Sequence, residues 1–157
     1  MKLSEIFVAD SVVPELQATD RNGVIRELVA SLAEHGAIDS NDAEAVGRMV
    51  IRRENEGSTG FGKGVAVPHV KHEAVKKLAA TIGRSSVGID FSALDRAPVY
   101  TVVLLVCPKN DPDAQLAAME KIFRHLQRDN FRRFLRQADT RDKIVELIKE
   151  ADETPED

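Results

Sequence analysis

Apolar residues recur every three to four positions over the first third of the chain, which predicts two amphipathic helices. The first is expected to run from a cap at Thr19 to about Glu34. Gly36 is expected to end it, because glycine adopts the left-handed conformation found at many helix ends. The second is expected to begin at a cap on Asp39 or Ser40. The inward-facing residues are expected to be Val24, Ile25, Leu28 and Leu32 in the first helix and Ala43, Val46, Met49 and Val50 in the second.

The middle of the chain changes to short runs of β-branched and apolar residues, which predict strands. Residues 65–69 and 78–85 are two such runs. Pro68 marks an edge or an end of the first, since proline has no N–H to donate within a sheet. The strongest signal spans 98–108, where nearly every residue is apolar or β-branched. That composition is typical of a strand covered on both faces.

The last third returns to helical spacing and predicts three more helices. The first is expected to have Asp111 as its cap and Pro112 in its first turn, the second a cap at Asp129 or Asn130, and the third a cap at Thr140. Their inward-facing residues are expected to be Leu116, Met119, Ile122, Phe123 and Leu126, followed by Ile144, Leu147 and Ile148.

This interleaving predicts an α/β fold in which a mixed sheet of about five strands has helices on both faces. The 157 residues, 43% of them hydrophobic, fit one globular domain over 1–152 with an acidic tail at 153–157. A net charge of −4 argues against a nucleic-acid binder. The single cysteine, Cys107, excludes an internal disulfide, and the opening residues carry no signal-peptide pattern. We therefore expect a soluble cytoplasmic protein without a membrane-inserted segment.

The segment from Gly57 to His72, GSTGFGKGVAVPHVKH, holds most of the candidate chemistry. Its glycines allow a loop in which backbone N–H groups approach a ligand closely, or simply an irregular connection from a helix to a strand. It is not a Walker phosphate loop, because Lys63 is followed by Gly64 rather than by Ser or Thr. It is not a dinucleotide fingerprint either, because it leaves a helix and enters a strand.

Two polar residues near these glycines need an explanation. Pro68 holds the backbone before His69 rigid, and a neutral imidazole with one accessible nitrogen is a base, a nucleophile or a metal ligand. Arg53 is expected on the buried, apolar stripe at the end of the second helix, where a guanidinium needs an anionic partner. That partner is either a nearby acidic side chain, Glu54 or Glu56, or a phosphate held between Arg53, the loop amides and His69.

The segment RRENEGSTGFGKGVAVPH resembles the signature of the enzyme IIA domains of the bacterial phosphoenolpyruvate-dependent sugar phosphotransferase system, in their fructose–mannitol–nitrogen-regulatory branch. The signature matches at Arg53, Glu54, Thr59, Gly60, Gly62, Gly64, Ala66, Pro68 and His69. Phe61 stands where the signature has an aliphatic residue. The resemblance extends over nearly the whole chain, and residues 1–29 look like the N-terminal strand and first helix of the family.

The resemblance implies a phosphoryl carrier that needs no metal and no cofactor. His69 would accept a phosphoryl group from the histidine-containing phosphocarrier protein. It would pass the group to a cysteine of an enzyme IIB domain, or hold it as a regulatory signal. Arg53 would lie against the phosphohistidine, while Thr59, Gly60, Gly62 and Gly64 would shape the phosphate pocket. Phosphoryl transfer suits such a site, because it depends on positioning and on charge stabilisation.

One residue departs from the family pattern. Many members carry a second histidine in the first turn of the helix after the central strand, and Gln115 stands there in this sequence. A glutamine amide can donate to a phosphate oxygen but cannot titrate. The alternative function is therefore a non-catalytic sensor or interaction module on the same fold, with altered phosphotransfer. Between sugar relay and regulation, Gln115 favours regulation.

Two further interpretations concern residues outside the signature. A zinc site could combine His69 and His72 with Cys107 or Glu73, although no recognised ligand spacing supports it. His125 is expected on a helix surface. An arginine-rich stretch is expected to be a solvated face, the alternative being a docking patch for an acidic partner or nucleic acid. It contains Arg124, Arg128, Arg132, Arg133 and Arg136.

Overall fold

The computed structural model describes residues 1–153, in which helices and strands interleave along the chain. The helices are α1 (Leu3–Ile6), α2 (Arg21–Glu34), α3 (Ala43–Glu56), α4 (Pro112–Leu126), α5 (Asp129–Gln137) and α6 (Arg141–Glu153), with short 3-10 turns η1 (Ala9–Ser11) and η2 (Ser40–Asp42). The strands are β1 (Gly60–Gly62), β2 (Val65–Ala66), β3 (His69–His72), β4 (Ala79–Ile89) and β5 (Val99–Pro108). The expected acidic tail lies outside the described residues apart from Glu153, which ends α6.

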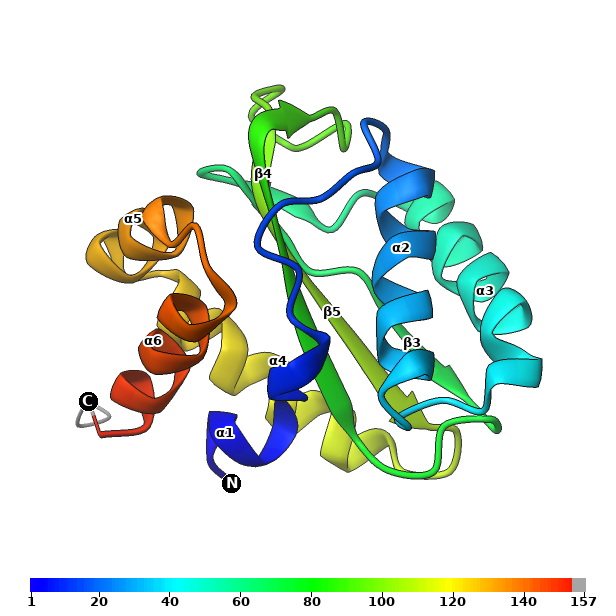
Figure 1. The fold of residues 1–157 in the computed structure, drawn as a ribbon. Coiled ribbons are helices and arrows are strands. Elements are labelled where there is room, and N and C mark those ends of the chain that lie inside the picture. Colours follow the sequence, from blue (N-terminus) through cyan, green and yellow to red (C-terminus); the bar gives the residue numbers. More distant parts are fainter. Residues whose placement is uncertain (154–157) are drawn as a thin grey trace.

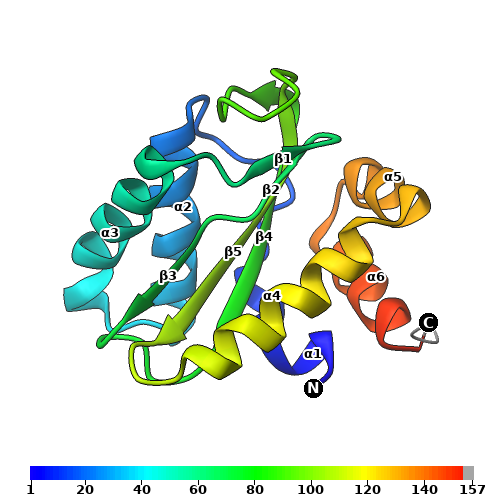
Figure 2. The same ribbon diagram turned by 180° about the vertical axis from the view of Figure 1, so that it is seen from behind.

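The described strands form one mixed sheet around β5. β4 pairs antiparallel with β5 along one side, while β2 and β3 pair parallel with successive parts of its other side. Pro68 lies between β2 and β3, and β1 extends the sheet by pairing antiparallel with β2. Helices cover both faces of this sheet (Figures 1 and 2). The prediction of an α/β fold with a mixed five-stranded sheet is therefore confirmed.

The segment before α2 differs from the expected N-terminal strand. Residues 1–18 form α1, η1 and two isolated bridges to β4, Phe7 to Ala80 and Val13 to Gly83. The η1 turn separates these bridges, so the segment follows the edge of β4 without forming a continuous strand.

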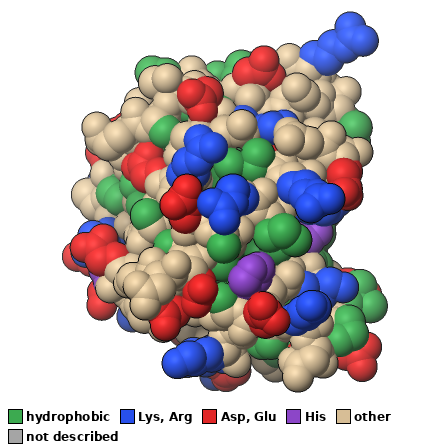
Figure 3. Space-filling model, turned by 90° about the vertical axis from the view of Figure 1, so that its right-hand side faces the viewer, with side chains coloured by type: hydrophobic (Ala, Val, Ile, Leu, Met, Phe, Trp, Pro, Cys, Tyr) green, Lys and Arg blue, Asp and Glu red, His purple; other side chains and the backbone are tan. Residues whose placement is uncertain are grey.

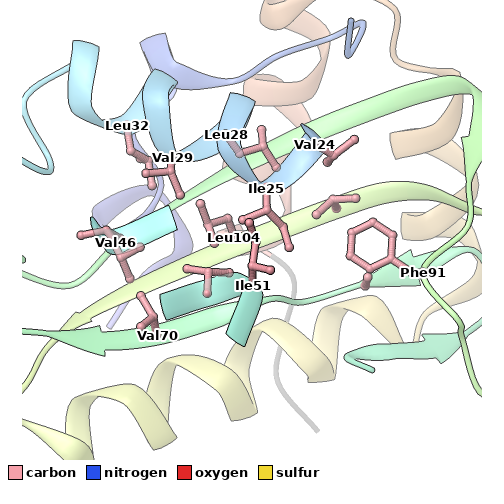
Figure 4. Packing of buried hydrophobic residues seen from close by; sticks show 14 of the residues in the cluster. Val24, Ile25, Leu28, Val29, Leu32, Val46, Ile51, Val70, Phe91 and Leu104 are labelled. Carbon is pink, nitrogen blue, oxygen red and sulfur yellow. The ribbon is translucent and has the colours of Figure 1, made fainter. Parts of the chain in front are cut away.

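One face of the sheet packs against α2 and α3. Apolar side chains from α2, α3, β3 and β5 meet there in a continuous cluster (Figure 4). Asp20, rather than Thr19, caps α2, because its carboxylate accepts the Gly23 N–H at 2.7 Å. Gly36 ends this region with a φ of 85°, as expected. Met49 was expected in the stripe of α3 but is exposed, because Val46 and Val50 already define the inward face.

The opposite face packs against α1, α4, α5 and α6. The caps at Asp111 and Thr140 are confirmed by bonds from the Ala114 and Lys143 N–H groups. The predicted stripe of α4 was wrong at Leu116, which is 59% exposed. His125 was also misplaced: it is 2% exposed and its ring lies 5.8 Å from that of Phe131. The buried residues of α4 are Ala118, Ile122, His125 and Leu126.

The arginine-rich stretch is not simply a solvated face. Arg132 donates to the Leu126 carbonyl oxygen at 2.8 Å and pairs with Asp129, and its side chain is only 12% exposed. The Arg136 guanidinium lies over the ring of Tyr100, 3.6 Å from its centre. These side chains attach α5 to its surroundings.

Candidate functional site

A cleft of about 620 Å³ lies between α3, the edge strand β3 and the first turn of α4. Its lining residues are Met49, Arg52, Arg53 and Glu56 from α3, His69, Val70 and Lys71 from β3, and Gln115 from α4. Figure 3 shows the side of the molecule on which α3 lies, where histidine side chains lie close to Lys and Arg side chains in a hollowed part of the surface. Three of the residues selected from the sequence, Arg53, His69 and Gln115, therefore share one cleft.

His69 is held at the start of β3 by its backbone. It pairs with Leu105 of the buried strand β5, and the Leu105 N–H donates to the carbonyl oxygen of Pro68 at 3.0 Å. The imidazole Nδ1 lies 3.0 Å from the carbonyl oxygen of Val67. Because a carbonyl oxygen only accepts hydrogen bonds, this contact favours the tautomer with the proton on Nδ1 and a lone pair on Nε2.

The surroundings of His69 favour its neutral form. Burial lowers the pKa of His69 below its ordinary value of 6.5, and the charges of Arg53 and Lys71 lower it further. The hydrogen bond to Val67 and the charge of Glu54 act in the opposite direction without reversing the shift in pKa. The imidazole is therefore mostly neutral at pH 7, which is the form that can act as a nucleophile.

Arg53 lies in the last turn of α3 and is half-buried at the cleft. Its Nη1 donates to the Gly57 carbonyl oxygen at 3.0 Å, which closes the end of the helix. A guanidinium has five N–H donors, so this bond leaves capacity for an anion in the cleft.

Glu54 was not singled out as a site residue from the sequence, although it is the buried residue at this helix end, with 2% exposure. Its two carboxylate oxygens accept the N–H of Thr59 at 2.7 Å and the hydroxyl of Thr59 at 2.8 Å. The signal was available, because Val46, Val50 and Glu54 follow one another at four-residue intervals on the buried face of α3. Thr59 is thus bonded to this carboxylate and is not among the residues that line the cleft.

The glycines of the signature belong to a hairpin and do not line the cleft. Gly62 and Gly64 have φ values of 103° and 79°; Gly62 ends β1, and Gly64 lies in the turn from β1 to β2. A side chain on Gly60 would come within 2.9 Å of the Cβ of Ala93, so the glycine permits the hairpin to pack on the segment before β5. Their role in shaping a phosphate pocket stays a prediction.

The candidate zinc ligands are not brought together. Residues 1–153 contain no group of three or more His, Cys, Asp or Glu side chains placed to bind a metal ion. Cys107 is buried on β5, and burial raises the pKa of its thiol to about 12. The Nδ1 of His72 accepts the N–H of Ala74 at 2.9 Å. Within the described part of the chain, no helix is both long enough and apolar enough to cross a bilayer.

Residues 5–151 match the family model for EIIA 2 of the phosphoenolpyruvate-dependent sugar phosphotransferase system. The fructose-specific EIIABC component of Bacillus subtilis is 30% identical over 97% of this chain, which spans only 24% of that protein. The fructose-specific EIIA component of Haloferax volcanii is 27% identical over 94% of this chain and 95% of its own length. The nitrogen regulatory protein of Bradyrhizobium diazoefficiens is 29% identical over 87% of each.

Solved structures share the fold. The nitrogen regulatory protein IIA-Ntr from Neisseria meningitidis has a TM-score of 0.82 and 23% identity, covering 93% of this chain and 98% of its own. The enzyme IIAMTL in its complex with phosphorylated enzyme IIBMTL from Escherichia coli has a TM-score of 0.76 and 18% identity, covering 92% and 99%.

Proposed function

The chain belongs to the EIIA 2 family of the phosphoenolpyruvate-dependent sugar phosphotransferase system, and we propose that His69 is the residue through which it carries a phosphoryl group. Membership of this family makes the chain a phosphotransferase-system component with a phosphocarrier or regulatory role. The observation that carries the assignment to His69 is its half-buried imidazole beside Arg53, with Nδ1 on the Val67 carbonyl oxygen and Nε2 left as the nucleophile.

The donor we propose is the phosphohistidine of the histidine-containing phosphocarrier protein, in the cytoplasm. The Nε2 lone pair of His69 attacks phosphorus, and the donor's N–P bond breaks with its electron pair returning to the donor imidazole. The proton on Nδ1 of His69 stays on that nitrogen throughout, hydrogen-bonded to the Val67 carbonyl oxygen. Because no proton has to move, the step depends on position and on stabilisation of the phosphoryl oxygens, which the Arg53 guanidinium supplies.

The phosphoryl group would then leave His69 for a cysteine of an enzyme IIB domain. The Cys107 thiol of this chain is no substitute for that acceptor, because it is buried and burial raises its pKa to about 12. A solved relative of this fold is a complex with a phosphorylated enzyme IIB, which supports a partner of this kind.

A second candidate function is regulation by the phosphorylated and unphosphorylated forms, and Gln115 favours it. Gln115 lines the same cleft as His69. Its amide can donate a hydrogen bond to a phosphoryl oxygen, which suits a retained phosphoryl group. Relatives named as fructose-specific components and as nitrogen regulatory proteins have similar identity to this chain, so they support either role.

The test is the intact mass of the protein after incubation with phosphoenolpyruvate, enzyme I and the phosphocarrier protein. We expect one acid-labile phosphoryl group on the wild type and on His72→Ala, the control three residues away on the same strand, and none on His69→Ala. Absence of a phosphoryl group from the folded wild type would overturn the carrier function and favour the interaction module. Subsequent addition of an enzyme IIB domain would separate relay from regulation, since only a relay loses the group to the IIB cysteine.

A further inference from the structure

A buried carboxylate, that of Glu54, follows the cleft-lining residue Arg53 on α3. Glu54 is 2% exposed, whereas Arg52 and Asn55 in the same last turn of α3 are exposed. Carboxylates are almost never buried to this extent unless their oxygens are satisfied by hydrogen bonds or by a positive charge. Both Glu54 oxygens are satisfied by a single residue, Thr59, through its backbone N–H and its hydroxyl. The bonding closes a loop from the last turn of α3 to the start of the hairpin.

This loop is connected to the imidazole by backbone hydrogen bonds. The carbonyl oxygen of Thr59 accepts the N–H of Val67 at 3.4 Å, and the carbonyl oxygen of Val67 faces Nδ1 of His69 at 3.0 Å. Thr59 therefore helps to hold residue Val67 in place through its N–H, and the carbonyl oxygen of Val67 in turn holds the imidazole. The amide of Gly57 also returns to the Glu54 carbonyl oxygen at 3.2 Å, so the backbone and the side chain of Glu54 both hold the junction.

Glu54 also acts on His69 through its charge. Its carboxylate favours the protonated imidazole, in opposition to Arg53 and Lys71, which favour the neutral one. When Nε2 bonds to phosphorus, the ring keeps its Nδ1 proton and becomes positively charged. A buried carboxylate nearby stabilises that ring charge, while the guanidinium of Arg53 serves the phosphoryl oxygens.

We propose that Glu54 and Thr59 are a positioning pair for His69, in which the carboxylate–threonine bonds hold the Val67 carbonyl under Nδ1 and the carboxylate charge supports the phosphorylated imidazole. The inference rests on the proposed function for its effect on phosphoryl transfer. Its structural part, the hold on the imidazole, is independent of whether a phosphoryl group ever arrives.

The variants that test the pair separate its hydrogen bonds from its charge. Glu54→Gln keeps the shape and removes the charge, Thr59→Val removes only the hydroxyl, and Thr59→Ser restores it. Glu44→Gln is the matched control, because Glu44 is on the same helix but is exposed and does not line the cleft. Two readouts are needed: the pH titration of the His69 ring signals by NMR, and the rate of phosphoryl acceptance from the phosphocarrier protein.

We expect Glu54→Gln to lower the pKa of His69 and to slow phosphoryl acceptance about tenfold, the loss typical of a hydrogen bond to a charged group. Thr59→Val should slow acceptance similarly and broaden or shift the Nδ1–H signal, Thr59→Ser should recover the wild-type rate, and Glu44→Gln should change neither readout. Equal behaviour of Glu54→Gln and Glu44→Gln in folded protein would overturn the proposal.

If Glu54→Gln does not fold, the comparison of Thr59→Val with Thr59→Ser decides, and equal acceptance rates in these two would overturn the pair. Failure of the proposed function would give a different experimental result. The wild type would then accept no phosphoryl group at all, while the NMR titration would still show whether Glu54→Gln shifts the pKa of His69.

Discussion

The imidazole Nδ1 of His69 lies 3.0 Å from the carbonyl oxygen of Val67, two residues earlier in the chain. The contact crosses Pro68, whose ring restricts the backbone between the two residues. A donor at Nδ1 leaves Nε2 as the nucleophilic nitrogen, and burial together with Arg53 keeps the ring neutral. The reactivity of His69 therefore depends on which ring nitrogen carries the proton and on the pKa of the ring.

We predict that His69 titrates below 6.5 and carries its proton on Nδ1 when neutral. Above pH 6.5 the ring is mostly neutral, and the rate of phosphoryl acceptance should not depend on pH. The rate should fall as the pH drops through the lowered pKa of His69.

The lowered pKa also affects folding stability. Stability should rise with pH between the pKa of the folded protein and about 6.5, because the unfolded chain binds more protons in that range. Long-range ¹⁵N–¹H NMR correlations report tautomer and midpoint, and a neutral ring protonated on Nε2 would contradict the assignment.

Arg53 should contribute to acceptance through its charge and its fork of N–H donors. We predict that Arg53→Ala slows phosphoryl acceptance by roughly 10- to 100-fold and shortens the lifetime of the phosphoprotein, the range expected for lost charge-assisted hydrogen bonds. Arg53→Lys should recover only part of this. Arg48→Ala is the control, since Arg48 is on the same helix and pairs with Glu44 at the exposed surface. Unchanged acceptance and lifetime in Arg53→Ala would exclude the guanidinium from the phosphate site.

Arg53 and Glu54 show that sequence periodicity predicts a helix but not which of two adjacent residues faces its buried side. The pattern predicted the helix but placed Arg53 on its buried stripe. A rotation of one residue decides which of two neighbours is buried, and α3 buries Glu54 instead. The glycines illustrate a second limit. Their spacing indicates unusual backbone conformations, which Gly62 and Gly64 have, but it does not say whether a ligand or a hairpin turn uses them. Contacts such as Glu54 with Thr59 depend on how the helix end meets the hairpin, which only the folded chain defines.

Gln115 should affect the lifetime of the phosphorylated state more than its formation. It lines the cleft from the first turn of α4, where its amide can donate to a phosphoryl oxygen. We predict that Gln115→Ala shortens the lifetime of the phosphohistidine about three- to tenfold, as expected from one lost hydrogen bond. Gln127→Ala, at the opposite end of α4, serves as the control. A lifetime equal to that of the control would place Gln115 outside the phosphate's reach.

Gly64 allows the hairpin role of the glycines to be separated from a phosphate role. Its φ of 79° costs an alanine about 1–2 kcal/mol, and a Cβ would lie 3.4 Å from the ring of Tyr100. We predict that Gly64→Ala lowers the Tm by about 2–8 °C while phosphoryl acceptance well below the Tm stays at the wild-type rate. Gly57→Ala, which meets no atom within 4 Å and has extended backbone, is the control. Loss of acceptance at unchanged Tm would instead support a glycine cradle for the phosphate.

Asp152 joins α6 to α1, and its loss should destabilise the fold without affecting the cleft. Its carboxylate accepts the N–H groups of Leu3 at 2.6 Å and Ser4 at 3.0 Å, and so supplies partners for the first turn of α1. Burial alone would raise the pKa of Asp152, but the bonds from Ser4 and Leu3 outweigh it and the pKa is lowered. A carboxyl group whose pKa is lowered by folding stabilises the protein at pH values above its unfolded pKa of about 3.9. This contribution disappears as the pH falls through the pKa of the folded state.

We predict that Asp152→Ala lowers the free energy of unfolding by about 1 kcal/mol at pH 7, which lowers the Tm by about 3 °C, and that the difference from wild type disappears in acid. Glu153→Ala, which removes the exposed neighbouring carboxylate, should leave the Tm unchanged, and a difference for Asp152→Ala that persisted at low pH would mean that packing, not the carboxylate, joins the two helices.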